Sequence, residues 1–419
     1  MSLKMKIFLF LIMNGFYFFS YFHRVGIPGT IFNEIQMDFH LTANQVAGLG
    51  AIVFYIYGFL QFFIGPCLDY FGTNRIFVTG GFLLCVGSFL FSFAHSVFFL
   101  FFSRVLVGFG ASVAYLGIVK KTDELFGRDF FSLMLGIALF LGYSGGLFAT
   151  LPFERMVNFF GWRQTMLVLS VILLLIMIFT LFAFIKNHQF SYKKNTMSFI
   201  DIKQILLNRK MYPVIFSAAI NFTVYFIFQS IIGKKLLQDT CGVTSKIAAS
   251  FTLFMMVSTM LFVLFWGTVT HIAKTRKSLI VFLCLISMIS CIMMLANFGI
   301  WKHPVIFLLC FFIFAIVGGS GPLTTTLIKE FNPSGVGTSV GFINGVCYIF
   351  VAISGNICGF IMDRFSSKAV ITKEAVVYPV DAYVVIVGLC TFISFFAFLS
   401  SLRITEPETK VKTEIPEPF

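Results

Sequence analysis

An arginine lies inside an apolar segment long enough to cross a lipid bilayer, within the stretch YFHRVGIPG at residues 21–29. Four polar side chains ending with this arginine follow spacings of three and four, so they share one face of a helix. They are Asn14, Tyr17, Tyr21 and Arg24. A guanidinium binds carboxylate or phosphate through two parallel hydrogen bonds. This face therefore predicts the wall of a site for an anionic or zwitterionic ligand, the alternative being an internal pair of Arg24 with a carboxylate or with helix carbonyls.

The composition identifies the setting of this segment. Of the 419 residues, 58% are apolar and 11% are charged, and the mean hydropathy is +0.96. A soluble core cannot bury so large an apolar fraction, so we expect an integral membrane protein. A bilayer core of about 30 Å requires roughly 20 apolar residues for each helical crossing. Because backbone groups in lipid have to be bonded within the segment, these crossings are predicted to be helices.

Charge clusters and Gly, Pro and Asn turns divide the apolar runs into twelve predicted spans. They lie at residues 7–35, 46–68, 76–94, 97–119, 131–153, 164–185, 212–232, 247–270, 278–297, 304–328, 336–362 and 380–402. The longest polar interval separates six spans from six. We therefore predict an all-α membrane protein with an N-terminal six-helix bundle at 1–186, a basic cytoplasmic linker at 187–211 and a C-terminal six-helix bundle at 212–402. The charged tail at 403–419 is expected to be disordered.

The net charge of +13 is explained by membrane topology better than by nucleic-acid binding, because the basic residues lie in short loops between spans. With a cytoplasmic N-terminus, 19 of the 30 Lys and Arg residues fall on the cytoplasmic side and nine on the opposite side. This bias favours both termini in the cytoplasm. The abundance of Phe, Ile and Lys is typical of an AT-rich genome and favours a bacterial inner membrane.

The two halves of the chain resemble each other. PFERMVNFFGWRQ after the fifth span is similar to IMDRFSSK after the eleventh, which places Glu154 and Arg155 209 residues before Asp363 and Arg364. GPCLDYFGTNR after the second span has a weaker counterpart after the eighth, GTVTHIAKTRK, at an offset of 202. Two similar offsets indicate one six-helix unit used twice, the arrangement from which alternating-access carriers are built.

The stretch GPCLDYFGTNR has the pattern G-x-x-x-D-x-x-G-x-x-R, through Gly65, Asp69, Gly72 and Arg75. Gly65 lets a neighbouring helix come close, and Gly72 permits a turn conformation closed to other residues. Asp69 can face the positive N-terminus of a helix. The motif lies at the inner end of the second of twelve spans.

In these features the sequence resembles the major facilitator superfamily, over essentially the whole chain apart from the tail. Three further stretches agree: RVLVGFG with Arg104 and Gly108, ELFGRDFFSLMLG before the fifth span, and KEFNPSGVGTSVG before the eleventh. The resemblance implies a rocker-switch secondary transporter with its substrate site between two bundles. It also implies that Asp69 and Arg75 are gate residues on the cytoplasmic side. For Arg104 it implies a structural or proton-coupling role, of which we favour the structural one.

Residues 21–75 also resemble the organophosphate/sugar-phosphate permease branch, whose first helix carries an arginine at a comparable place. That branch has a second arginine in helix 7, which PVIFSAAINFTVYFIFQS lacks. A carboxylate ligand, as in an amino acid, peptide or organic acid, is therefore as plausible as a phosphate ester. Further polar pairs on spans that line the cavity in family members complete an expected hydrogen-bonding ring. They are Tyr57, Gln61, Asn221, Tyr225, Gln229, Asn344 and Tyr348.

Proton coupling usually requires a carboxylate within the membrane, and the acidic residues here lie at span ends. His23 is the titratable residue near mid-membrane suited to proton exchange. We expect it to point away from the Arg24 face and to bond between helices. Proton symport, exchange with a counter-substrate and facilitated diffusion therefore all remain open.

An enzyme is not expected, because the motifs G-x-x-x-x-G-K-[ST] and H-E-x-x-H do not occur in the sequence. We expect no cofactor, no metal site and no nucleic-acid partner, and a monomer in the bilayer. The predicted function is a secondary active transporter of a small polar metabolite. The alternatives are an efflux carrier for a siderophore- or drug-like compound and a non-transporting sensor on the same fold.

Overall fold

The computed structural model describes residues 2–186, 208–272, 275–301, 303–331 and 336–406. Within these residues, eleven helices are long and apolar enough to cross a membrane, and a pair bent by 41°, Leu133–Phe148 and Leu151–Phe160, makes a twelfth span. The predicted all-α fold with twelve crossings is therefore confirmed. The linker at 187–207 and the tail from 407 lie outside the described residues.

The helices of the first half run in an antiparallel series. They are α1 (Leu3–Gly26), α2 (Phe32–Phe39), α3 (Ala43–Phe71), α4 (Thr73–Ser92), α5 (Val97–Phe148), α6 (Leu151–Phe160) and α7 (Trp162–Lys186). Helix α5 holds two spans that meet at Gly127, where φ is +70° and the backbone leaves the helical conformation. A side chain with a Cβ rarely adopts that conformation, so Gly127 permits the chain to reverse there.

The second half repeats this pattern with more interruptions. Its helices are α9 (Tyr212–Phe226), α10 (Gly233–Cys241), α11 (Ser245–Ile272), α12 (Lys277–Ala296), α13 (Pro304–Gly318), α14 (Gly321–Phe331), α15 (Val336–Arg364) and α16 (Val380–Leu402). Short turns of 3-10 or π helix lie at Arg209–Met211, Ile227–Ile231, Asn297–Trp301 and Ser366–Lys368. Strands β1 (Val370–Ile371) and β2 (Val376–Val377) form an antiparallel hairpin with Val370 opposite Val377.

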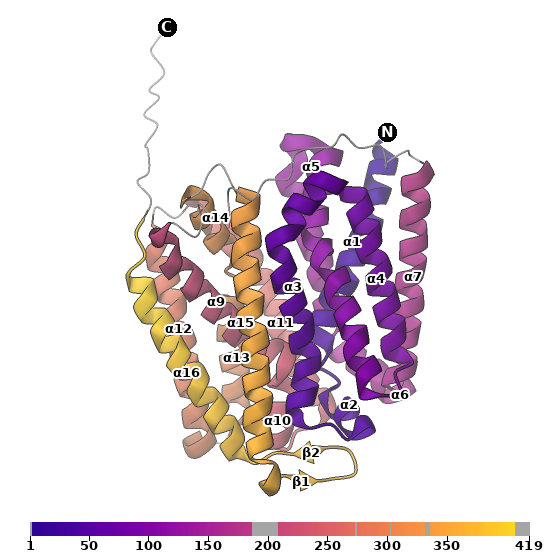
Figure 1. Cartoon of the computed structure of the whole chain (residues 1–419). Coiled ribbons are helices and arrows are strands. Elements are labelled where there is room, and N and C mark those ends of the chain that lie inside the picture. The colour runs from indigo at the N-terminus through magenta and orange to yellow at the C-terminus, as the bar shows by residue number, and fades with distance from the viewer. Residues whose placement is uncertain (1, 187–207, 273–274, 302, 332–335, 407–419) are drawn as a thin grey trace.

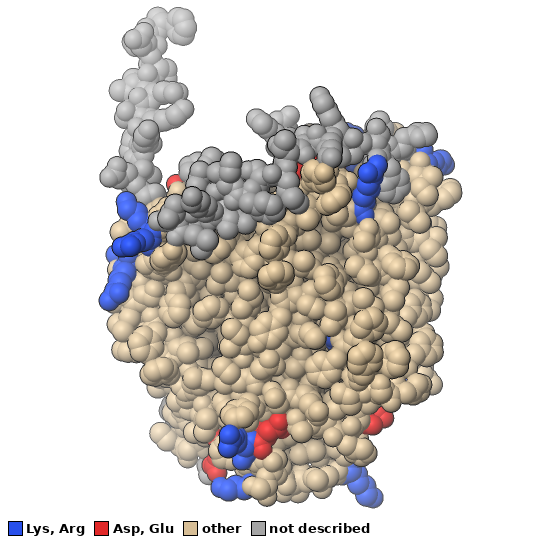
Figure 2. Space-filling model, viewed as in Figure 1, with Lys and Arg blue, Asp and Glu red and all other residues tan. Residues whose placement is uncertain are grey.

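The two ends of the helix array differ in what they carry (Figure 1). The start of α1 and the end of α16 lie at one end, which we call the terminal face, and α2, α6, α10 and the β-hairpin lie at the other, which we call the hairpin face. On the side shown in Figure 2, coloured charged residues gather near these two ends, and a broad uncharged belt separates them. Large rings such as Phe82, Phe98 and Phe182 are more than half exposed. Such a belt is the surface that lipid tails cover.

The first predicted span is wrong in its extent. It was expected to run from 7 to 35, but α1 ends at Gly26 and residues 27–31 separate it from α2. Pro28 has no N–H for the helical ladder and its ring clashes with the preceding turn. Gly29 then passes so close to the other half that a Cβ there would lie 2.8 Å from the Ser230 carbonyl oxygen. Arg24 consequently lies in the last turn of α1 rather than in the middle of a long helix.

Small residues let α5 pack directly against α1. A Cβ on Gly145 would lie 2.0 Å from the Phe18 carbonyl oxygen, and one on Gly142 would lie 2.1 Å from the ring of Tyr17. Close approach of helix backbones through small residues is typical of membrane interfaces. The glycines of the fifth span therefore position the tyrosine face of α1.

The halves meet along α3 and α15 through another set of glycines. A Cβ on Gly58 would lie 2.8 Å from the Gly345 carbonyl oxygen, and one on Gly359 would lie 2.5 Å from the Cα of Asn44. This seam brings Tyr348 of α15 beside Tyr57 of α3, with ring centroids 4.5 Å apart.

Candidate functional site

Arg24 is a buried cation with one nitrogen unused. Its side chain is 2% exposed, Nε donates to the Ser20 carbonyl at 3.2 Å, and Nη1 donates to the Tyr348 hydroxyl at 2.6 Å. Nη2 has no hydrogen-bond partner among the described residues. A buried polar group without a partner costs free energy. This nitrogen is therefore the place where a ligand oxygen would gain the most.

Aromatic rings, rather than an acid, surround the guanidinium. Its Cζ lies 4.5 Å from the centroid of Tyr21, 4.9 Å from that of Tyr57 and 5.5 Å from that of Tyr348. Cation–π contacts of this kind stabilise an arginine without neutralising it. Among the described residues, Arg24 forms no ion pair with a carboxylate, and its hydrogen bonds go to the Ser20 carbonyl and the Tyr348 hydroxyl.

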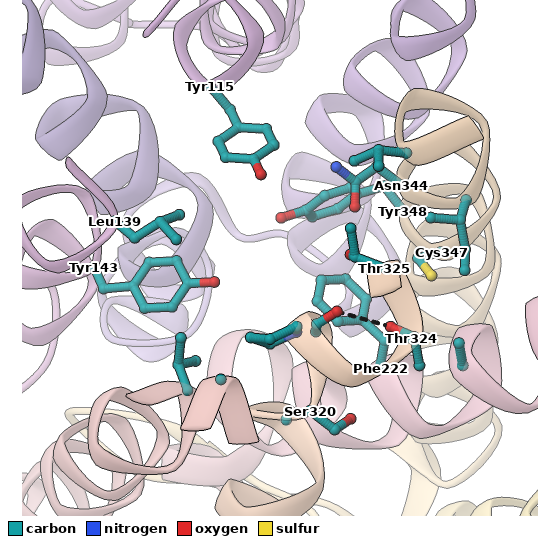
Figure 3. A pocket seen from close by; sticks show the side chains of 18 of the residues that line it. Tyr115, Leu139, Tyr143, Phe222, Ser320, Thr324, Thr325, Asn344, Cys347 and Tyr348 are labelled. Carbon is teal, nitrogen blue, oxygen red and sulfur yellow. Dashed lines mark hydrogen bonds between the residues drawn. The ribbon is translucent and has the colours of Figure 1, made fainter. Parts of the chain in front are cut away.

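The guanidinium borders a cavity of about 360 Å³ between the two halves (Figure 3). Residues of α1, α3 and α5 line one side, and residues of α9, α11, α13, α14 and α15 line the other. Thr270, near the end of α11, and Leu135, early in the second span of α5, extend the lining toward the terminal face. The lining contains no Asp, Glu, Lys or His, so Arg24 is its one charged residue among those described.

Six of the eleven residues predicted for the ligand site line the cavity. They are Tyr17, Tyr21, Arg24, Tyr57, Asn344 and Tyr348. Asn14 instead donates to the Phe10 carbonyl of its own helix at 2.8 Å, and Gln61 donates to the Ser112 carbonyl of α5 at 2.9 Å. Both are buried helix contacts, so helix spacing alone does not place a side chain in the cavity.

The predicted face of the seventh span is turned away from the cavity. Asn221 donates to the Cys284 sulfur at 3.3 Å, Tyr225 contacts the Met256 sulfur at 3.7 Å, and Gln229 donates to the Thr252 carbonyl at 3.3 Å. These partners belong to α11 and α12. The cavity is lined from α9 by Ala218 and Phe222, because the helix points its apolar face inward and its polar face at neighbouring helices.

Sequence reasoning did not select three rings that line the cavity. Tyr115 and Tyr143 of α5 direct their hydroxyl groups into the open space, across from Asn344 and Thr325, and Phe222 lies beyond them (Figure 3). Tyr115 lies two residues before Gly117, in AYLG, and Tyr143 directly follows Gly142, in GYSGG. A tyrosine within an apolar span, beside glycines that allow close packing, was the available signal.

Arg104 lies apart from the cavity and binds backbone. It is fully buried, Nε donates to the Leu49 carbonyl at 2.9 Å, and Nη2 donates to the carbonyls of His23 and Ile27 at 3.0 and 3.1 Å. The last carbonyls of a helix lack intrahelical partners and carry partial negative charge. Arg104 thus provides hydrogen-bond donors for carbonyl groups at the end of α1, in the turn that carries Arg24.

His23 lies in the same internal network. Its Nε2 lies 3.2 Å from the Ser88 hydroxyl, which in turn lies 2.6 Å from the Ser170 hydroxyl. Its Nδ1 lies 3.5 Å from Nη1 of Arg104. The imidazole does not line the cavity. Protonation of this imidazole would place its positive charge beside that of Arg104. This geometry matches the expected helix-to-helix contact of His23.

Arg104→Leu is expected to lower the free energy of unfolding by about 3 to 5 kcal/mol, because three buried carbonyls lose a charged donor. Unfolding of the purified protein by SDS in mixed micelles measures the loss. The exposed Arg155 supplies the control Arg155→Leu, which should change stability by less than about 0.5 kcal/mol. Unchanged stability of Arg104→Leu with altered pH dependence of transport would instead indicate a coupling role.

The gate motif lies at the terminal face. Asp69 forms an ion pair with Lys120 of α5, within the same half of the chain. Gly72 has φ +89° between α3 and α4, as the tight turn requires, and a Cβ on Gly65 would meet nothing within 4 Å. The close helix contact predicted for Gly65 is therefore absent in this structure. Arg75 lies in the first turn of α4, where its carbonyl accepts from Thr79. A Cβ on Gly108, of the stretch RVLVGFG, would lie 3.0 Å from the side chain of Ile56 in α3.

The hairpin face is closed by contacts between the two halves. Lys234 of α10 donates to the Thr30 carbonyl at 2.6 Å and lies 3.8 Å from Glu34. Gln36 of α2 donates to the Tyr378 hydroxyl at 2.9 Å. Lys234 is 4% exposed, so this lysine, counted above as a loop cation, is buried in the closure.

Asp363 adds to this closure from α15. Its carboxylate accepts from the backbone N–H groups of Ala43 and Asn44, at 2.7 and 3.1 Å, and so caps the N-terminus of α3. An acidic group at the N-terminus of a helix is stabilising. The cap joins the second half of the chain to the first.

A buried ion pair supports α10 from behind. Lys235 donates to Asp239 at 2.7 Å, and Asp239 also accepts from the Tyr383 hydroxyl and the Tyr378 N–H. Burial raises the pKa of Asp239 and lowers the pKa of Lys235, and the attraction between them opposes both shifts. Burial also raises the pKa of Tyr378 to about 12. The carboxylate thus ties α10 to the segment that follows the β-hairpin.

The chain is similar to several transporters of known sequence. It is 30% identical over 162 residues to Monocarboxylate transporter 9 of Pongo abelii, which is 38% of this chain and 31% of that protein. It is 27% identical over 164 residues to Monocarboxylate transporter 2 of Homo sapiens, at 37% and 32% coverage. It is 28% identical over 172 residues to the uncharacterized transporter YybO of Bacillus subtilis (strain 168), at 40% and 38%. The matched part thus spans about a third of the length of these relatives.

The fold is similar to that of a solved structure, a bacterial homolog of the human lysosomal transporter Spinster in an inward-facing and unoccupied conformation. The TM-score is 0.77 at 13% identity, covering 96% of this chain and 98% of that one, and this likeness concerns the fold alone. The sequence of residues 13–355 matches the Major Facilitator Superfamily. Because that match extends over more than half of the chain, the chain belongs to the Major Facilitator Superfamily.

Proposed function

We propose that this protein is a secondary carrier of a small organic anion that bears a single carboxylate. The observation that carries the proposal is the Nη2 of Arg24, buried and unpartnered beside a cavity whose described lining holds no acid. A carboxylate oxygen there would complete a charge-assisted hydrogen bond. The names of the monocarboxylate transporters among its relatives support the same class of ligand.

The charge of the cavity favours a carboxylate over a phosphate ester. A phosphate monoester carries about −1.5 to −2 charges near neutral pH, whereas the described lining offers Arg24 as its one cation. A second buried negative charge would be left uncompensated, at a cost. The predicted organophosphate branch is therefore the less favoured one.

We further propose that the terminal face is cytoplasmic, in a bacterial inner membrane, with both termini inside. In that orientation the closed hairpin face is external, and the cavity extends toward the cytoplasm from Arg24. The structure then corresponds to an inward-open state of an alternating-access cycle. The reverse step would close the terminal face and separate the contacts of Lys234, Gln36 and Asp363.

Exchange with a counter-substrate fits the cavity better than proton symport. The described lining holds no carboxylate or imidazole to carry a proton, and His23 packs between helices. Substrate would neutralise Arg24 when bound, whereas an empty carrier would have to occlude an unpaired cation. Loaded carriers should therefore reorient faster than empty ones.

Ligand-dependent stabilisation of the purified protein tests the proposal. Monocarboxylates are compared with their neutral amides and with glycerol 3-phosphate, and the best ligand is then used for counterflow in liposomes. We expect stabilisation by a carboxylate, weaker stabilisation by its amide, and counterflow of the labelled acid. Equal effects of acid and amide, or a stronger effect of the phosphate ester, would contradict a carboxylate site. Binding without counterflow would identify a sensor instead of a carrier.

Lys234→Met is expected to open the hairpin face more often, because the Thr30 carbonyl loses a charged donor from the other half. Hydrogen exchange of the backbone amides in α2 should become about tenfold faster, which corresponds to about 1.4 kcal/mol. The exposed Lys246 near the start of α11 provides the control Lys246→Met, which should leave α2 exchange unchanged. Equal exchange in both variants would mean that this contact does not hold the face closed.

A further inference from the structure

We propose that the carried acid is an aryl carboxylate, with its carboxylate on Arg24 and an aromatic ring enclosed by the rings of the cavity. This inference rests on the proposed function and narrows it from monocarboxylates in general to one class. It follows from three properties of the cavity: the rings on both of its sides, the hydrogen bonds already made by three hydroxyl groups of residues 320–326, and its volume.

Aromatic rings form one continuous wall on the side of the first half. Tyr17 and Tyr115 lie 6.0 Å apart between centroids, Tyr17 and Tyr21 lie 6.4 Å apart, and Tyr21 and Tyr143 lie 4.7 Å apart. The last two pairs are tilted or edge-on, with interplanar angles of 79° and 52°. Tilted rings expose both faces and edges to the space between them. Such surfaces suit an added ring in a stacked or edge-to-face arrangement.

Rings also border the opposite side. Phe222 of α9 lies 5.1 Å from Tyr348 of α15 in an edge-on contact at 84°, and the centroid of Tyr57 lies 4.5 Å from that of Tyr348. Figure 3 shows open space between this group and the rings of Tyr115 and Tyr143. A flat ligand ring placed there would meet aromatic carbon on two sides, with Arg24 at one end of the space.

The hydroxyl-rich segment at α14 offers less to a ligand than its composition suggests. Ser320 donates to the Val317 carbonyl at 2.6 Å, Thr324 to the Gly321 carbonyl at 3.0 Å, and Thr326 to the Pro322 carbonyl at 2.9 Å. These hydroxyl protons are used within their own segment. Asn344 is the one side-chain amide in the described lining. A sugar acid, which needs donors and acceptors for every buried hydroxyl, is therefore matched less well than a ring.

The volume agrees with a ligand larger than a three-carbon acid. A cavity of about 360 Å³ falls in the range of about 300 to 1,000 Å³ that is typical of sites for drug-sized ligands. Apolar surface gains free energy in proportion to the area removed from water. An acid with a methyl or methylene body would leave most of these rings in contact with water, whereas a phenyl or indole body would cover them.

A series of acids that share a carboxylate and differ in the group attached to it tests the inference. Dissociation constants for propionate, 3-phenylpropionate, 3-cyclohexylpropionate and gluconate are measured in detergent, with the wild-type protein and with Arg24→Gln. We expect 3-phenylpropionate to bind at least about tenfold more tightly than propionate and about threefold more tightly than the cyclohexyl acid. Gluconate should bind no better than propionate.

Three substitutions locate the effect. Tyr143→Leu should reduce the preference for 3-phenylpropionate over propionate to less than about threefold, whereas Tyr143→Phe should retain it because the ring remains. Phe82→Leu changes an exposed ring outside the cavity and should leave the preference as it is. Because each value is a ratio of two affinities on one preparation, partial misfolding of a variant does not change it.

The outcomes separate the two levels of the proposal. If propionate or gluconate binds as tightly as 3-phenylpropionate, and Arg24→Gln abolishes that binding, the aryl inference is wrong and the carboxylate carrier stands. If none of the acids binds in a manner that depends on Arg24, the proposed function is itself wrong.

Discussion

We expect Arg24→Gln to abolish the stabilisation of the protein by the best-binding carboxylate. We also expect it to lower the counterflow of that ligand in liposomes by at least about 100-fold. The substitution removes the cation while keeping a polar side chain of similar length. Losing a charge-assisted hydrogen bond in a buried site costs about 3 kcal/mol, and each 1.36 kcal/mol corresponds to a factor of ten. Uptake of labelled acid, normalised to the amount of folded protein, measures the effect.

Arg24→Lys distinguishes charge from geometry. A lysine retains the positive charge but presents a point charge instead of a planar fork, so activity should fall between those of the wild type and the glutamine variant. Arg364 is exposed at the hairpin face, and Arg364→Gln serves as a matched control that should transport normally. Transport by Arg24→Gln within a few-fold of the wild type would remove Arg24 from the site and leave it a packing role with Tyr348.

Gly145→Ala should destabilise the protein by at least about 3 kcal/mol, the largest stability effect that we predict for a single methyl group. The added Cβ would lie 2.0 Å from the Phe18 carbonyl oxygen. Overpacking usually costs about 1 to 3 kcal/mol, and here the obstacle is backbone, which cannot rotate away. Helix α1 would have to move from α5 and carry the rings of Tyr17 and Tyr21 with it, so ligand affinity should fall as well.

The same helix supplies the control for this prediction. A Cβ on Gly136 would meet nothing within 4 Å, so Gly136→Ala should be neutral or stabilise by up to about 1 kcal/mol through helix propensity. SDS unfolding midpoints of the two variants are compared with that of the wild type. Similar midpoints for both would show that α1 and α5 are not packed as closely as the structure has them.

The sequence alone was sufficient for the membrane class, the number of crossings and the first helix's polar face. Each of these depends on residues close together in the chain. Apolar content over about 20 residues decides whether a segment enters lipid, and spacings of three and four place Tyr17, Tyr21 and Arg24 on one side whatever the helix packs against. Packing then turned that side toward the cavity, which all three residues line in the structure.

The boundary of the first helix was less predictable. Apolar residues continue past Pro28 to residue 35. Hydropathy does not detect the missing backbone N–H of Pro28 or the close contact of Gly29 with Ser230. Backbone interruption at this point sets the last turn of α1 and therefore the position of Arg24.

The tertiary structure decided which helix faces meet the cavity. The side chains of Asn221, Tyr225 and Gln229 share one face, as their spacing predicts, but that face binds α11 and α12. Similarly, Arg104 donates hydrogen bonds to three backbone carbonyls, and Lys234 donates to the Thr30 carbonyl, 204 residues away in the chain. Rotation of a helix about its axis, and pairing across the halves, depend on contacts distant in sequence. Periodicity within a span fixes which residues share a face, and packing alone determines what that face meets.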